Sequence, residues 1–172
     1  MKWLEPEVTE RGHFDTNLTA EQYDRWEWGL TRELVYQDPV HGTITVPAGF
    51  KTNFASLRIL RTLAVALILT SLLISLLPLP AVVSLLLKVI GAGLIILYAA
   101  LIGYGNAASA VHDYLYDEIC TLGLSRPESD DVIYRAARAE GVARWRASPF
   151  YIGVRIGGKS HYKTPISSGF SI

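Results

Sequence analysis

An imidazole and a carboxylate stand side by side in the chain, at His112 and Asp113. Residues four apart share one face of a helix, so on a helix Tyr116 would lie beside His112. An imidazole can take a proton from water near neutral pH, and a carboxylate can hold a hard cation that polarises a substrate oxygen. These residue types at this spacing therefore indicate general-base chemistry assisted by a cation as one use of the site.

The same residues have a structural interpretation, in which Asn53 and Asp130 join them in a buried polar network. Buried polar groups must be paired, and a fully paired network specifies one packing of the core. We expect His112 and Asp113 to face the sheet that carries Asn53 and to be bridged to each other, because their helix is otherwise apolar. Tyr116 belongs to the same network. We favour this interpretation over catalysis.

Two helices must position these side chains. The first is expected from about Asn106 to Cys120. The second begins at a capping box, Ser125 to Glu128, with a proline near the helix start, and Gly141 is a natural stop. A short third helix is expected around residues 147–156.

The segment before residue 58 predicts a small antiparallel sheet. The run Trp28–Gln37 is followed by turn residues, Asp38 and Pro39, and then by the alternating, β-branched run Thr43–Val46. Together the strands and helices predict an α+β fold.

Between these parts lies a long apolar region that no acidic residue interrupts, with Lys88 as its one charge between Arg61 and Asp113. Pro78 and Pro80 break it into two segments, which predicts a transmembrane-like helical hairpin over residues 59–105. About 20 helical residues cross a bilayer core. The second segment is long enough and the first is somewhat short, so the hairpin could span a bilayer, insert part way, or be a buried core hairpin. The expected contacts with membrane or neighbouring subunits are Leu69, Leu73, Leu86, Lys88, Leu94 and Ile95.

Both ends of a hairpin emerge on one side, so residues 1–58, the β-rich half, and 106–172, the helical half, should build one polar domain. A formal net charge of +0 argues against a nucleic-acid partner. Near the end of the chain, Arg144, Arg146 and Arg155 could contact lipid phosphates, and Trp145 could be an interfacial anchor. A solvated face with local ion pairs is the simpler expectation.

Several segments of the chain resemble the DUF1353 family, in the same order: residues 46–56, 108–116, 125–130, 141–142 and 151–155. The resemblance extends from about Leu30 to Gly158. It implies a small protein of bacteriophages or prophages, without an assigned biochemical function. The chain departs from the family pattern at Asn53, where an aspartate is usual, and in the inserted hairpin.

The string from His112 to Tyr116 is also similar to the active-site helix of phospholipases A2. That resemblance implies His112 as general base, Asp113 as calcium ligand and Asp130 as the residue that orients the imidazole. The glycine-rich calcium loop of those enzymes is not evident, and Asn53 removes a further acid.

We therefore expect a non-enzymatic component of a phage virion, in the tail tip or baseplate. Its hairpin would pack on other tail proteins, within a homo-oligomer or multi-subunit assembly, or engage the host membrane during genome delivery. Two alternatives stay open. One is a membrane-associated, calcium-dependent, phospholipase-like hydrolase that uses His112 and Asp113; the other is a phage-encoded lysis or exclusion factor of the host membrane.

Overall fold

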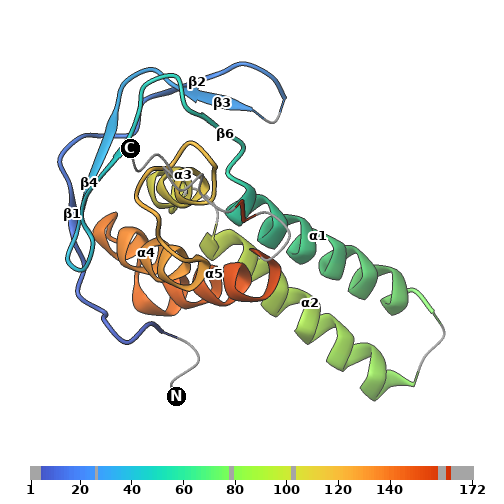
Figure 1. Cartoon of the computed structure of the whole chain (residues 1–172). Helices are drawn as coiled ribbons and strands as arrows, with labels where there is room; N and C mark the ends of the chain where they lie inside the picture. The colour runs from blue at the N-terminus through green and yellow to red at the C-terminus, as the bar shows by residue number, and fades with distance from the viewer. Residues whose placement is uncertain (1–4, 26, 78–79, 102–103, 159–161, 164–172) are drawn as a thin grey trace, which may run out of the picture. The chain divides into compact units, whose positions relative to one another are not determined.

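In the computed structural model the chain forms two compact units (Figure 1). The polar unit comprises Met1–Leu57 and Tyr104–Ile172, and the hairpin unit comprises Arg58–Gly103. The structure describes residues 5–25, 27–77, 80–101, 104–158 and 162–163, without the side chains of 55–64, 94 and 97–101.

The polar unit begins with two small antiparallel sheets. The first has the order β1-β4-β5 and the second β2-β3-β6. Alternation buries one face of the first sheet: Tyr36 of β4 lies opposite Ile44 of β5, and both are fully buried. The strands are β1 (His13–Phe14), β2 (Ala20–Gln22), β3 (Trp28–Leu30), β4 (Leu34–Asp38), β5 (Gly42–Val46) and β6 (Lys51–Thr52).

Three helices follow the hairpin: α3 (Asn106–Leu115), α4 (Arg126–Ala139) and α5 (Arg144–Gly157). Helix α4 packs against both α3 and α5, and the first sheet lies against α3 and α4 (Figure 1). The predicted α+β class is confirmed, with two three-stranded sheets where we expected one.

The helix ends follow local chemistry. Helix α4 begins as predicted, because the Glu128 carboxylate accepts hydrogen bonds from the N–H and O–H of Ser125 at 2.7 and 2.5 Å. It is followed by Gly141, whose φ is 85°. Helix α3 ends at Leu115, before the predicted Cys120, because Asp117 forms a turn in which its Oδ1 accepts the N–H of Ile119.

Helix α3 lacks a side-chain cap of its own. Its first turn is satisfied from α4, since the Glu140 carboxylate accepts the backbone N–H groups of Ala107 and Ala108 at 3.1 and 2.9 Å. Glu140, the C-cap residue of α4, thus caps the N-terminus of α3. Helix α5 is longer than the predicted 147–156 and contains Pro149 within its second turn.

The hairpin unit consists of helices α1 (Ala55–Ser75) and α2 (Ala81–Leu101). Pro78, at the predicted break, lies outside the described residues. The two helices approach closely at Gly91, where an added Cβ would lie 2.7 Å from the Ser71 Oγ. A small residue at this point therefore permits the helices to pack side by side.

The composition of the hairpin predicted that its helices could span a bilayer. Among the described residues, no helix combines the length and apolar character needed to traverse a bilayer.

Candidate functional site

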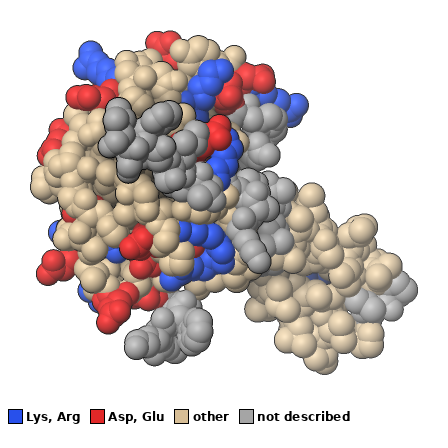
Figure 2. Space-filling model, in the orientation of Figure 1, with Lys and Arg blue, Asp and Glu red and all other residues tan. Residues whose placement is uncertain are grey.

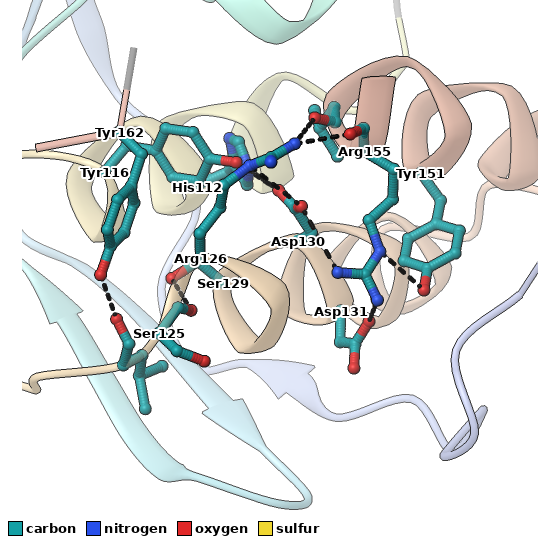
Figure 3. A network of polar contacts seen from close by, with 12 residues as sticks. His112, Tyr116, Ser125, Arg126, Ser129, Asp130, Asp131, Tyr151, Arg155 and Tyr162 are labelled. Atoms are coloured by element: carbon teal, nitrogen blue, oxygen red, sulfur yellow. Dashed lines mark hydrogen bonds and ion pairs between the residues drawn. The ribbon is translucent and has the colours of Figure 1, made fainter. Parts of the chain in front are cut away.

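A fully buried carboxylate, Asp130 of α4, stands at the centre of the principal polar network (Figure 3). A side chain of α3 and that of Tyr116, the residue after its end, converge on the Oδ1 atom of Asp130. The His112 Nε2 lies 3.2 Å away, and the Tyr116 hydroxyl donates a short hydrogen bond. The imidazole and phenol rings stack with their centroids 4.1 Å apart. The network therefore joins α3 to α4 through one carboxylate oxygen.

The other oxygen of Asp130 faces two arginines. The Arg126 Nε, one turn earlier on α4, and an Nη of Arg155 on α5 each lie 3.7 Å from Oδ2. Arg126 also donates to the backbone carbonyls of Val154 and Arg155, near the end of α5. Two positive charges thus lie beside the buried carboxylate and connect α4 to α5.

The aromatic members of this cluster are held in their neutral forms. Burial, strengthened by the hydrogen bond to Asp130, raises the pKa of Tyr116 well above its usual value. Burial also raises the pKa of Tyr151, whose hydroxyl accepts a hydrogen bond from the Arg155 Nε at 3.1 Å. Both phenols stay protonated at physiological pH, so Tyr116 serves as a donor.

Chemically, an imidazole whose Nε2 lies against a carboxylate has the arrangement of an oriented general base. The surroundings disfavour that use, because His112 is 2% exposed and Asp130 is 0% exposed. Within the described part of the chain, no group of three or more His, Cys, Asp or Glu side chains is placed to hold a metal ion.

Asp113 has a different neighbour. Its Oδ2 accepts a hydrogen bond of 2.5 Å from the buried Thr52 hydroxyl, whose oxygen in turn accepts the N–H of Phe54. Phe54 has a φ of 49°, which is uncommon for a residue with a side chain. Asp113 therefore fixes α3 to β6 and to the tight bend that follows it.

The structure brings His112, Tyr116 and Asp130 together, as the network interpretation requires, but it places Asp113 and Asn53 differently. The His112 Nε2 contacts Asp130, while the Asp113 Oδ2 contacts Thr52. A bridge between His112 and Asp113 stays a prediction. Asn53 is exposed, and the preceding residue makes the contact with α3.

Sequence reasoning missed the two arginines of the network, Arg126 and Arg155. The first had a usable signal, since it precedes Asp130 by four residues, the spacing of a helical ion pair. The second lies on another helix, and nothing local in the sequence marks it.

A second buried ion pair was also missed. The Arg135 Nε and Nη2 donate to the two oxygens of Asp38 at 2.8 and 3.1 Å, and both side chains are almost fully buried. Asp38 also accepts the N–H groups of Val40 and His41 in the β4–β5 turn. This bidentate pair fixes α4 to the first sheet.

On the hairpin unit, the candidate contact residues of the described part are exposed. The relative exposures are 59% for Leu69, 68% for Leu73, 57% for Leu86 and 53% for Ile95, and Lys88 is exposed as well. The side chain of Leu94 lies outside the described residues. In Figure 2 the hairpin surface is almost uniformly uncharged on the face shown, whereas acidic and basic groups are spread over the polar unit.

Comparison with known proteins gives one family match. Residues 93–154 match the model of DUF1353, whose description is a protein of unknown function. The match omits residues 46–56, so it covers less of the chain than the expected resemblance from Leu30 to Gly158. Neither the curated proteins nor the solved structures gave a match. The matched range, a DUF1353 family domain, includes α3, α4 and the network residues His112, Tyr116, Arg126 and Asp130, and it ends one residue before Arg155.

Proposed function

We propose that the protein is a non-enzymatic structural component of a multi-subunit assembly, and that the hairpin unit is its contact element towards neighbouring subunits. The setting that we propose is a phage virion, at the tail tip or baseplate. This setting rests on the sequence resemblance alone.

The observation that carries the proposal is the exposed apolar surface of α1 and α2. Large side chains are exposed on both helices, with Leu73 at 68% on α1 and Val82 and Ile96 at 70% and 69% on α2. A monomeric protein in water rarely leaves a contiguous apolar surface of this extent uncovered. Covering it with the apolar surfaces of neighbouring subunits removes that area from water, which is the main driving force of protein association.

The Asp130 network supports a structural role for the polar unit. Two arginines face the carboxylates of Asp130 and Asp131, and the histidine is enclosed, so the network is suited to fixing three helices in one arrangement. A polar unit whose helices have one fixed arrangement is suited to a structural part of an assembly.

The direct test is Leu73→Arg in the encoding phage, with Val40→Arg as the matched control. Both residues are exposed and apolar, at 68% and 50%, but Val40 lies in the polar unit. We expect Leu73→Arg to prevent incorporation into particles, because an unpaired charge would be buried in an apolar contact. Val40→Arg should be incorporated normally. Equal incorporation of both variants would refute the role of the hairpin.

A second candidate is a membrane-associated, phospholipase-like hydrolase, and the specific observation in its favour is the His112 Nε2 beside Asp130. On this alternative, His112→Gln would abolish calcium-dependent release of fatty acid from phospholipid, since loss of general-base catalysis costs roughly 10²- to 10⁴-fold in rate. On the proposed function, the unmutated protein shows no such release, and His112→Gln lowers the free energy of unfolding by about 1 to 3 kcal/mol.

A further inference from the structure

Four residues of the polar unit form an exposed patch of arginines and aromatic rings, which we call the aromatic–arginine patch: Tyr104, Arg144, Trp145 and Arg146. The Arg146 guanidinium lies over two rings, 4.6 Å from the centroid of Tyr104 and 4.8 Å from that of Trp145. Both rings are open to solvent, with Trp145 58% exposed and Tyr104 44% exposed. Tyrosine and tryptophan are enriched at interfaces, where one end of the side chain is apolar and the other is hydrated.

The positive charge of the patch is not neutralised within the described part of the chain. There, neither Arg144 nor Arg146 forms an ion pair, and the buried Nε of Arg146 has no hydrogen-bond partner. Arg155 differs, because it lies near the carboxylates of Asp130 and Asp131. Of the three arginines that could meet lipid phosphates, two therefore have no carboxylate partner among the described residues, and one is paired within the fold.

The position of the patch in the helix adds to this charge. Arg144 and Arg146 lie in the first turn of α5, which carries no acidic residue. The N-terminal end of a helix bears a partial positive charge, so the helix dipole and the two arginines act in the same direction. A ligand that matches this positively charged patch must therefore carry negative charge.

We propose that the aromatic–arginine patch binds the anionic headgroup surface of a lipid bilayer. Tryptophan and tyrosine favour the boundary between water and acyl chains, where the ring is buried and its polar edge stays hydrated, and arginine pairs with phosphate. A protein partner would fit the aromatic rings equally well. The two unpaired arginines beside them favour phosphate-rich lipid.

Chain connectivity supports this choice. Tyr104 follows the end of α2, at Leu101, by three residues, so the patch includes the first residue of the polar unit after the apolar hairpin. The patch goes beyond the proposed function, because it gives the polar unit a ligand that subunit packing does not require.

The test is cosedimentation of the purified full chain with two kinds of vesicles. One is made of phosphatidylcholine alone, and the other of three parts phosphatidylcholine to one part phosphatidylglycerol. We expect the unmutated chain to prefer the anionic vesicles, with a preference that declines as salt is added. The double variant Arg144→Gln, Arg146→Gln should bind the anionic vesicles roughly 30-fold more weakly and the neutral ones without change.

The matched control is Arg11→Gln with Arg32→Gln, which removes the same net charge from two exposed positions elsewhere on the polar unit. It should retain the anionic preference. A second pair of variants tests the rings: Tyr104→Ala should weaken binding, whereas Tyr23→Ala should not. Tyr23 is likewise an exposed tyrosine beside a cation, with the Lys51 Nζ 5.7 Å from its ring centroid.

Three results would overturn the proposal. The first is absence of vesicle binding by the unmutated chain, and the second is equal binding to anionic and neutral vesicles. The third is an equal effect of the patch and control double variants. Circular dichroism of each variant verifies that the helices are retained, so that a loss of binding is attributable to the patch.

Discussion

At the scale of single residues, the polar unit depends on charges that have been removed from water. Asp130 is fully buried and has two arginines on one side and the His112 ring and the Tyr116 hydroxyl on the other. Taking such groups out of water costs several kcal/mol, and their mutual attraction offsets that cost only while every partner is in place. Removing one partner should therefore lower the free energy of unfolding by more than the contacts of that partner alone contribute.

Asp130→Asn tests this directly. The amide retains most of the shape but removes the charge that Arg126 and Arg155 require. We expect the free energy of unfolding to fall by about 3 kcal/mol or more, measured by urea denaturation. Asp131→Asn is the control, because that carboxylate is partly exposed and lies near Arg155 and Tyr151, at the edge of the network. A cost below about 1 kcal/mol for both variants would contradict the network's role.

Arg135→Met makes a second residue-scale prediction. It leaves the buried Asp38 carboxylate without its bidentate partner, so the free energy of unfolding should fall by about 3 to 5 kcal/mol. Lys51→Met removes an exposed ion pair with Glu27 and should cost no more than about 1 kcal/mol. Similar losses in the two variants would show that burial does not determine the strength of these pairs.

At the scale of elements, local chemistry predicted the start of α4 well and the end of α3 poorly. The Ser125–Glu128 box is a short-range signal that is readable without any knowledge of the fold. The end of α3 depends on the side chain of Asp117, whose turn competes with continued helix. The link between Glu140 and the first turn of α3 joins residues more than thirty positions apart, and no periodicity marks such a pair.

The capping box also gives a prediction about pH. Hydrogen bonds from Ser125 lower the pKa of Glu128, so its ionised form stabilises the fold. That contribution is present above the ordinary glutamate pKa of about 4.3 and is lost as the pH falls through the lowered value. Ser125→Ala should lower the free energy of unfolding by about 1 kcal/mol at pH 7 and should raise the Glu128 pKa, as measured by NMR titration. An unchanged Glu128 pKa would mean that the box does not form in solution.

At the scale of the whole molecule, composition alone separated the hairpin from the polar parts on either side of it, because a long run without acidic residues is visible in any sequence. The α+β class followed from alternation and capping. The division of the strands into two sheets could not be predicted in this way. Strand β6 pairs with β3, although β4 and β5, which belong to the other sheet, lie between them in the chain. The ion pair of Asp38 with Arg135 likewise joins residues 97 positions apart. Such pairings are decided by packing of the complete fold.

Function at this scale depends on what covers the exposed side chains of α1 and α2. In the polar unit the buried carboxylates of Asp38 and Asp130 have arginine partners. In the hairpin unit, by contrast, Leu69, Leu73 and neighbouring apolar side chains are exposed. On our account those side chains meet other subunits of a particle. We therefore propose that the protein is present in an assembly, in fixed proportion to its neighbours.

Quantitative mass spectrometry of purified phage particles tests this claim most directly. We predict that peptides of this chain are present in the particles, at a constant ratio to the tail proteins, and that the ratio collapses in the Leu73→Arg variant. Recovery of the chain only from host membranes or from the soluble fraction of infected cells, with none in the particles, would contradict the account.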